Sequence, residues 1–304
     1  MTIDITGTTA DAPAQGGAGV VLRLRNATLG FAERTLWSGL DLDVAAGEFI
    51  AVLGANGSGK TSLLKVILGQ QRLLSGEATF LGEPLARGNR RIGYIPQQKP
   101  AGEGTPLRAR DLVALGLDGH RWGFPLPSRR RRTDVAAVLD VVGGRPYAKV
   151  PISTLSGGEQ QRLRVGQALA GGPRLLLCDE PLLSLDLAHQ RLVSELIDRH
   201  RRERRFGVLF VTHDVNPILG MVDRVLYLAG GRFRIGSPDE VLRSDVLSDL
   251  YGSPVDVIRT HGRIVVVGAP DGPHSHPDGL DVLHDAQHEP DHGGRHVTEG
   301  ATKP

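Results

Sequence analysis

A glycine-rich octapeptide has the residue types that bind phosphate. Residues 54–61, Gly-Ala-Asn-Gly-Ser-Gly-Lys-Thr, match the pattern of a glycine, any four residues, Gly-Lys and then serine or threonine. Its glycines let the backbone turn and bring N–H groups close to phosphate oxygens. The Lys60 ammonium would reach the β and γ phosphates, and the Thr61 hydroxyl would ligate Mg²⁺. The residues predicted to bind the phosphates of a nucleotide are Gly54, Ala55, Asn56, Gly57, Ser58, Gly59, Lys60, Thr61 and Ser62.

Two adjacent carboxylates, Asp179 and Glu180, end an apolar run at residues 175–178. Such a run indicates a strand buried on both faces of a parallel sheet, and ligands gather at the carboxyl ends of these strands. Neighbouring residues on a strand point to opposite faces, so the two acids cannot share one role. One of them could instead simply cap a helix or end the strand.

The pentapeptide Leu-Ser-Gly-Gly-Glu at residues 155–159 precedes a stretch that reads as a helix up to Leu169. A serine hydroxyl and glycine N–H groups at the start of a helix form an anion-binding end. The chain therefore has a second predicted phosphate-binding element, separate from the glycine loop. Its residues are Leu155, Ser156, Gly157, Gly158 and Glu159.

The elements that position these residues alternate between strand and helix patterns. Residues 49–53 form an apolar run before the glycine loop, and residues 62–68 have the apolar spacing of a helix. A third apolar run, residues 208–211, ends in Thr-His-Asp, which brings His213 to the same crevice. A lone histidine is more often structural, and its position at a strand end favours a functional role.

The glycine loop, the pentapeptide and the Asp-Glu pair, in this order, resemble the nucleotide-binding subunit of an ATP-binding-cassette (ABC) transporter. The resemblance implies an α/β fold of the P-loop NTPase type, with a parallel-sheet core, an antiparallel β lobe and a helical subdomain. It covers residues 20–268, with the helical subdomain at about 98–154. The strands of the antiparallel lobe are expected at residues 20–31, 40–44 and 77–80.

The resemblance also implies a role for single residues. Asp179 would hold Mg²⁺ as the Walker B acid, Glu180 would polarise the attacking water, and His213 would contact the γ phosphate. Gln97 matches the Q-loop, which senses Mg²⁺ and the membrane partner, and the adjacent Gln98 leaves that assignment open by one position. Phe31 stands where the family has an aromatic ring that stacks on adenine, with a core phenylalanine as the alternative.

In this family the signature pentapeptide binds the γ phosphate held by another subunit. The resemblance therefore implies a homodimer with C2 symmetry, in which two chains face head to tail and sandwich two ATP molecules. Asp186 matches the D-loop that lines this interface. Leu183 and Ser184 depart there from the commoner serine and alanine.

Composition limits the alternatives. The chain has 304 residues and 40% hydrophobic content, enough for one large domain or two smaller lobes. No stretch of eighteen apolar residues predicts a membrane span, and residues 1–19 lack the pattern of a signal peptide. A net charge of +2 does not predict a polyanion-binding protein. The arginines at 129–132 could touch lipid headgroups, a partner or nucleic acid, although a solvated loop is the simpler interpretation.

Both ends of the chain differ in composition from the cassette. Residues 1–19 are small and polar and are expected to form a disordered lead. Residues 269–304 are rich in proline, glycine, aspartate and histidine, which also predicts disorder. The tail histidines His284, His288, His292 and His296 recur every fourth residue and are candidate ligands for a metal such as Zn²⁺. A solvated tail without a metal is the alternative.

Two segments are similar to those of zinc and manganese importer ATPases, residues 181–186 and 250–257. The resemblance implies an ATPase at the cytoplasmic face of the membrane that uses ATP and Mg²⁺. Its partners would be a polytopic membrane permease and, indirectly, an extracytoplasmic metal-binding protein. A siderophore or cobalamin is an alternative cargo. A non-transport ABC ATPase acting on nucleic acid is the alternative class, and the short helical segment argues against it, so no nucleic acid partner is expected.

Overall fold

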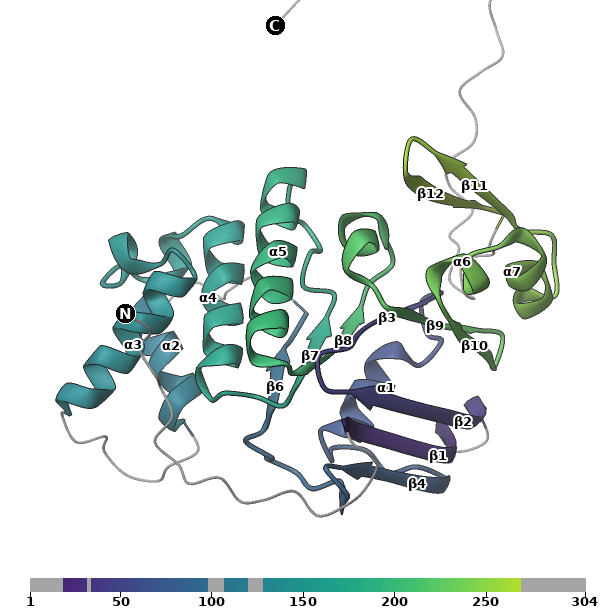
Figure 1. Cartoon of the computed structure of the whole chain (residues 1–304), viewed down its shortest axis with the longest axis horizontal. Coiled ribbons are helices and arrows are strands. Elements are labelled where there is room, and N and C mark those ends of the chain that lie inside the picture. Colours follow the sequence, from purple (N-terminus) through teal and green to yellow (C-terminus); the bar gives the residue numbers. More distant parts are fainter. Residues whose placement is uncertain (1–18, 32–33, 98–106, 120–127, 269–304) are drawn as a thin grey trace, which may run out of the picture. The chain divides into compact units, whose positions relative to one another are not determined.

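A six-stranded sheet with the strand order β10-β9-β3-β8-β7-β6 carries the site (Figure 1). The computed structural model describes residues 19–31, 34–97, 107–119 and 128–268. All neighbouring strands from β9 to β6 are parallel, and β10 is antiparallel to β9. The strands are β3 (Phe49–Gly54), β6 (Ile92–Ile95), β7 (Leu175–Asp179), β8 (Gly207–Val211), β9 (Arg224–Ala229) and β10 (Arg232–Gly236). The apolar runs expected as buried strands are confirmed as β3, β7 and β8.

A second, antiparallel sheet has the strand order β2-β1-β4-β5. Its strands are β1 (Val20–Phe31), β2 (Arg34–Ala45), β4 (Ser75–Phe80) and β5 (Glu83–Pro84). The expected strand at residues 20–31 is confirmed, whereas β2 begins six residues before the expected residue 40. The reason is Trp37, which is fully buried and keeps the earlier residues paired with the end of β1.

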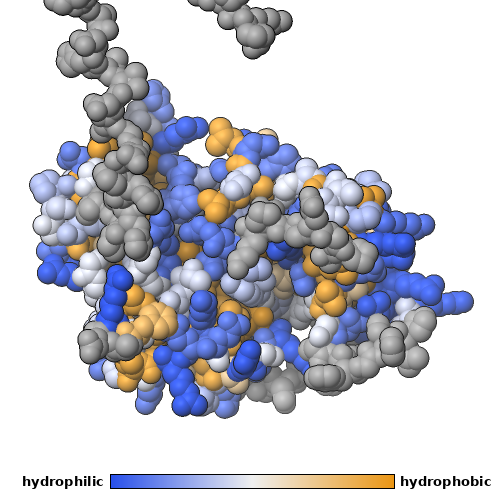
Figure 2. Space-filling model, turned by 180° about the vertical axis from the view of Figure 1, so that it is seen from behind, coloured by the Kyte–Doolittle hydropathy of each residue, from blue (hydrophilic) through white to orange (hydrophobic). Residues whose placement is uncertain are grey.

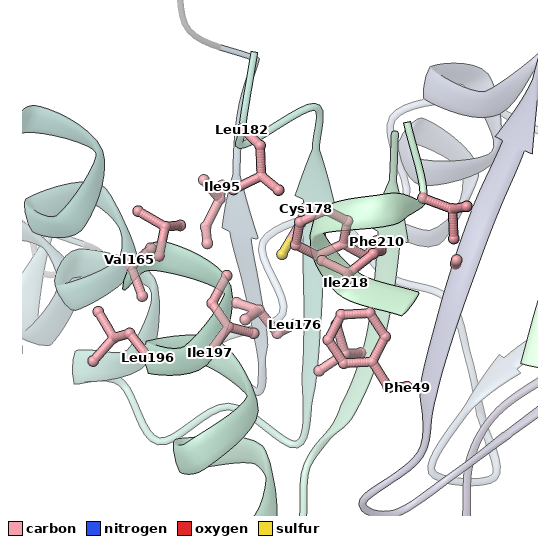
Figure 3. Packing of buried hydrophobic residues seen from close by; sticks show 14 of the residues in the cluster. Phe49, Ile95, Val165, Leu176, Cys178, Leu182, Leu196, Ile197, Phe210 and Ile218 are labelled. Atoms are coloured by element: carbon pink, nitrogen blue, oxygen red, sulfur yellow. The ribbon is translucent and has the colours of Figure 1, made fainter. Parts of the chain in front are cut away.

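The parallel sheet separates two hydrophobic cores. Successive residues of a strand point to opposite faces, so Ile50 packs with the antiparallel sheet and α1 (Lys60–Ile67), whereas Phe49 belongs to the other core. That other core also contains α4 (Gly157–Ala170) and α5 (Leu187–Arg204). Figure 3 shows Phe49, Cys178 and Phe210 of the sheet near Leu196 and Ile197 of α5.

Cys178 is the only cysteine of the chain and lies in β7. Its side chain is fully buried, and burial raises the pKa of the Cys178 thiol well above its ordinary value, with a smaller contribution from the neighbouring Asp179 carboxylate. The prediction that Cys178 is a small buried hydrophobic residue is therefore confirmed.

The helical subdomain contains α2 (Ala109–Asp118), α3 (Arg129–Val141), α4 and two short 3₁₀ turns, η1 (Arg145–Tyr147) and η2 (Ile152–Thr154). The interpretation of residues 129–132 as a solvated loop is wrong, because these arginines form the first turn of α3. Positive charge at a helix N-terminus opposes the helix dipole. The Asp118 carboxylate at the end of α2 offsets it through a bidentate contact with Arg131.

The connection from β8 to β9 contains a short 3₁₀ turn, η3 (Asn216–Met221), which contacts α5. After β10, the edge strand, the described chain continues with two helices and a hairpin. They are α6 (Pro238–Val241), α7 (Ser244–Tyr251), β11 (Asp256–Thr260) and β12 (Arg263–Val267). The two strands of the hairpin pair antiparallel with each other and with no further strand of the described residues. In Figure 1 the hairpin of β11 and β12 is drawn above α6 and α7.

Within the described residues, no helix is long and apolar enough to cross a membrane. The face shown in Figure 2 is largely hydrophilic, with hydrophobic side chains in small scattered groups. Several predictions concern residues outside the described part of the chain. They are the disordered lead up to residue 18, the alternative Gln98, and the tail from residue 269 with His284, His288, His292 and His296.

Candidate active site

The phosphate loop joins β3 to α1 and needs glycine for a steric reason. Gly54 has a φ of 136°, and a Cβ atom there would lie 2.0 Å from the Leu228 carbonyl oxygen. Gly57 and Gly59 also have positive φ, at 76° and 98°. The loop can therefore bring its backbone close to a ligand, as the sequence pattern predicts.

Lys60 folds back over this loop. Its Nζ donates hydrogen bonds to the carbonyl oxygens of Gly54 at 2.7 Å and Ala55 at 2.9 Å. Burial lowers the pKa of Lys60, and the nearby carboxylates of Glu180 and Asp179 partly oppose that shift. The ammonium thus lies at the mouth of the loop with backbone oxygens as its partners, and phosphate oxygens would be stronger acceptors for it.

Asp179, the last residue of β7, is buried beside the start of α1. Its carboxylate accepts hydrogen bonds from the Thr61 hydroxyl at 3.0 Å and from the Tyr94 hydroxyl at 3.3 Å. Burial raises the pKa of Asp179 above the usual aspartate value, and the two hydrogen bonds only partly offset this. Burial and the same carboxylate raise the pKa of Tyr94 to about 12, so this phenol stays protonated as a donor.

Glu180 lies at the meeting point of three strand ends. It follows β7 with a φ of 48°, in the left-handed region, and its side chain is 15% exposed. The Gln97 Nε2 atom donates to Glu180 Oε2 at 3.1 Å, and His213 Nδ1 lies 3.8 Å from Glu180 Oε1. The structure therefore brings together Glu180, His213 and Gln97, the three residues that the sequence predicts to be catalytic. Gln97 is in direct contact with Glu180.

A cavity of about 1240 Å³ contains the phosphate loop. Phe31 lines it at the end of β1 and is 54% exposed, so the alternative of a core phenylalanine is wrong. The far wall comes from the C-terminal hairpin, with Ile264, Val265 and Val266. The other predicted residues that line the cavity are Gly54, Ala55, Asn56, Gly57, Gly59, Lys60, Thr61, Ser62, Gln97, Glu180 and His213.

The signature pentapeptide forms the first turn of α4. Ser156 is the N-cap residue: its Oγ accepts from the Glu159 N–H at 3.3 Å, and the Glu159 carboxylate accepts from the Ser156 N–H at 2.9 Å. This reciprocal capping box fixes the start of the helix. Among the described residues that line the large cavity, none belongs to the pentapeptide. One chain therefore does not bring its own signature to its own phosphate loop.

Asp186 caps α5 and is linked to the signature through a residue that the sequence analysis missed. The Asp186 carboxylate accepts from the His189 N–H at 2.8 Å and contacts His189 Nδ1 at 2.8 Å. The His189 ring lies directly on Gly158, where a Cβ atom would come within 2.0 Å of Cδ2. A histidine three residues after an N-cap aspartate was the only sequence signal for this contact.

The residues of the loop fit a nucleoside triphosphate and a divalent cation. The Ser58 hydroxyl of the loop is buried without a hydrogen-bond partner in the described part of the chain, so it is free to donate to a phosphate oxygen. A hydroxyl and a carboxylate, Thr61 and Asp179, are oxygen ligands of the kind that Mg²⁺ takes. This donor set suits Mg²⁺ bound together with ATP.

Comparison with known proteins agrees with this geometry. A family model described as ABC transporter matches residues 37–183. The zinc import ATP-binding protein of Hahella chejuensis is 34% identical over 233 residues, which cover 77% of this chain and 84% of that protein. The chain belongs to the ABC transporter ATP-binding family. Since the ATP-binding subunits of this family are ATPases, this chain is an ABC-type ATPase.

Relatives of this ABC ATPase include importers of several substrates. The hemin import ATP-binding protein of Myxococcus xanthus is 35% identical over 250 residues, covering 77% of this chain and 90% of that protein. Further relatives at 31% and 34% identity are named for manganese transport and for aliphatic sulfonate import. The chain is therefore an importer-type ABC ATPase, and the names of its relatives do not converge on one substrate.

A solved structure shows the same fold. A metal-chelate type ABC transporter in an inward-facing conformation has a chain that aligns with a TM-score of 0.69 and 26% identity. The alignment covers 81% of this chain and 96% of that chain. The expected α/β fold, with its parallel core and antiparallel lobe, is thus confirmed.

Proposed function

We propose that this ABC ATPase binds and hydrolyses MgATP between two copies of itself and thereby energises import of a divalent metal, zinc or manganese. The observation that carries the catalytic part is the position of Glu180. Its carboxylate contacts Gln97 and His213 beside the phosphate loop. No other carboxylate of the described residues that line this cavity has both of these partners.

Each residue has a distinct part in the proposed reaction. Glu180 orients and polarises the water that attacks the γ phosphate, and Gln97 and His213 hold that carboxylate and the water in place. Lys60 and the N–H groups of the loop neutralise the growing charge on the phosphate oxygens. Thr61 and Asp179 would hold Mg²⁺, which would supply further charge neutralisation when bound. Catalysis in this scheme comes from positioning and electrostatic stabilisation, as in other phosphoryl transfers.

The dimer accounts for the position of the signature. The N-terminus of α4, with Ser156 as its cap, has the polarity to bind an anion, yet it lies outside the cavity of its own chain. A second copy related by a twofold axis would place this turn, with Asp186, against the γ phosphate of the first. The Phe31 ring at the edge of the cavity would stack on the adenine.

The substitution Glu180→Gln tests the catalytic assignment. It keeps the size and shape of the side chain, removes its charge and turns one acceptor oxygen into an amide donor, so ATP should still bind while turnover falls at least about 100-fold. The measurements are nucleotide affinity, turnover, and ATP-dependent dimer formation by size-exclusion chromatography with light scattering. The matched control is Glu195→Gln, an exposed glutamate of α5 paired with Arg191, which should leave turnover unchanged. Turnover surviving in Glu180→Gln would refute the mechanism.

The cargo and the partners rest on the relatives. Zinc import proteins recur among the relatives, and a manganese transport protein is also present. We infer a peripheral subunit at the cytoplasmic face of the membrane, bound to a polytopic permease, with an extracytoplasmic metal-binding protein as an indirect partner. In this proposal residues 20–268 form the ATPase domain, and the tail histidines could bind the same metal.

Uptake by cells tests the cargo. A strain that lacks this chain should take up radioactive zinc or manganese more slowly, and wild-type protein but not Glu180→Gln should restore uptake. Normal metal uptake with impaired hemin uptake would overturn the metal assignment and leave the ATPase assignment intact. A turnover that DNA or RNA stimulates, without co-purification of a polytopic membrane protein, would favour the non-transport class.

A further inference from the structure

We propose that Asn216 is a positioning residue for His213 and that it joins the loop carrying His213 to the C-terminal hairpin. The inference rests on the catalytic role proposed above for His213. It goes beyond that role, because it makes turnover depend on a segment at the far end of the ATPase domain. The contacts of the Asn216 side chain carry the argument.

The Asn216 amide pairs with the backbone of β12. Its Nδ2 donates to the Ile264 carbonyl oxygen at 2.9 Å, and the Ile264 N–H donates to its Oδ1 at 2.8 Å. Both backbone groups of Ile264 therefore point away from β11 and toward the sheet. The amide takes the place of a neighbouring strand at the free edge of β12. Asn216 and Ile264 are 48 residues apart, so this contact exists only in the folded chain.

The same side chain is bound to the loop that carries His213. Asp214 Oδ1 accepts from Asn216 Nδ2 at 2.8 Å and from the Asn216 N–H at 2.9 Å. Thr212 Oγ1 donates to the Asp214 carbonyl oxygen at 2.8 Å and accepts from the Asp214 N–H at 3.2 Å. These bonds lie on both sides of His213 in the chain. The His213 side chain is 55% exposed, and its Nδ1 lies 3.8 Å from Glu180 Oε1. The backbone around His213 is thus held by local bonds among Thr212, Asp214 and Asn216, and the Asn216 side chain connects these bonds to the hairpin.

The hairpin that Asn216 contacts is packed into the hydrophobic core through Ile264. Ile264 is 5% exposed and belongs to the same hydrophobic core as the parallel sheet. A separate bond reaches the hairpin on β11, where the Val257 N–H donates to Ser244 Oγ of α7 at 2.9 Å, and it involves neither Asn216 nor the loop that carries His213. A loop tied to such an anchored edge has less freedom, and small misplacements of a catalytic group cost large factors in rate. Asn216 therefore sets the distance between His213 and Glu180.

Two substitutions separate this role from a general structural one. Asn216→Ala removes the amide that bridges the hairpin and the loop, whereas Ser244→Ala removes an equally short bond to the hairpin that does not reach the loop. In the full-length chain we expect Asn216→Ala to lower kcat at least about 10-fold with the KM for ATP within about twofold of wild type. Ser244→Ala should leave both values near wild type. Equal losses in the two variants would refute a positioning role.

A double substitution shows whether the effect passes through His213. His213→Ala alone should lower kcat, and adding Asn216→Ala should then cost nothing further, because the positioned ring is already absent. Full additivity would overturn the inference. A normal kcat in His213→Ala would refute the proposed role of His213 itself, which distinguishes the two failures. If Asn216→Ala unfolds, as its melting temperature would show, the nearly isosteric Asn216→Asp takes its place. That variant keeps one acceptor, loses both side-chain donor bonds and should lower kcat similarly.

Discussion

Two opposing effects act on the pKa of the buried Asp179 carboxylate. Its position at the end of β7 removes it from water, which raises its pKa, while the hydroxyls of Thr61 and Tyr94 stabilise the ionised form. An acid whose pKa is raised by folding destabilises the folded protein once it ionises. The free energy of unfolding of the metal-free protein should therefore fall as pH rises from the usual aspartate pKa through the raised pKa of Asp179. It should stay lowered at neutral pH.

The substitution Asp179→Asn tests whether the Asp179 carboxylate lowers the stability of the protein while turnover depends on it. At pH 7 we expect the melting temperature of the metal-free protein to be at or above that of wild type, because a buried charge is removed. Turnover with Mg²⁺ should fall at least about 100-fold, since the carboxylate proposed to hold Mg²⁺ loses its charge. Calorimetry and a phosphate-release assay measure the two effects. The control Asp249→Asn, an exposed aspartate paired with Arg234, should change neither. A clear loss of stability in Asp179→Asn would contradict the argument.

The residues found from the sequence and the residues missed differ in a physical way. Glu180 and His213 could be found because each follows an apolar run that indicates a buried strand, and the ends of such strands converge. Tyr94 and Asn216 act through partners distant in the chain, and no local pattern marks them. His189 has its spacing from Asp186 as a local signal, but its contact with Gly158 lies on another helix. Their contacts depend on strand register and helix packing, which one sequence does not specify.

At the scale of elements, the first turn of α4 has both a structural and a proposed catalytic part. The capping box of Ser156 and Glu159 satisfies N–H groups at the helix start, and the same turn is the anion-binding end proposed for the signature. A loss of activity on mutation could thus come from a weakened helix alone. The chain contains a second capping box, Ser237 with Glu240 at the start of α6, that allows the two effects to be separated.

Comparing Ser156→Ala with Ser237→Ala isolates the proposed role of the signature. Each substitution removes an N-cap hydroxyl, so each should lower the free energy of unfolding by about 1 kcal/mol. Only Ser156→Ala should abolish ATP-dependent dimer formation and turnover. Urea denaturation, light scattering and phosphate release measure these outcomes. If turnover of Ser156→Ala stays near wild type, or if both variants lose it equally, the signature has no specific part in catalysis.

The elements show where sequence patterns are reliable. The runs at β3, β7 and β8 are apolar throughout because both faces of these strands are buried, and this pattern predicts them well. The start of α3 was missed, because four successive arginines at a helix N-terminus oppose the helix dipole. The Asp118 carboxylate on α2 compensates for this charge, and that contact depends on tertiary structure.

For the whole molecule, the separation of signature and phosphate loop makes a single chain an incomplete enzyme in our proposal. Each site of the dimer would combine the loop of one chain with the signature of the other. Turnover per chain should then rise with protein concentration, and variants defective in different halves of the site should complement each other.

Mixing Lys60→Ala with Ser156→Ala tests this arrangement. Each variant alone has no complete site, but a mixed dimer has one, formed by the Lys60 loop of the second variant and the Ser156 turn of the first. Random pairing should restore up to about a quarter of wild-type turnover, because half of the dimers are mixed and half of their sites are intact. Phosphate release after mixing in equal amounts measures it. A mixture as inactive as its components would argue against sites shared between chains.

The burial of Cys178 makes the protein suitable for site-specific labelling. Thiolates, not thiols, react with maleimides and spin labels, and the buried Cys178 thiol has a strongly raised pKa. With no other cysteine in the chain, one introduced on an exposed position would be the only reactive thiol of the native protein. Distances between probes on two copies could then be followed during ATP turnover without first replacing the native cysteine, whose side chain fills part of the core.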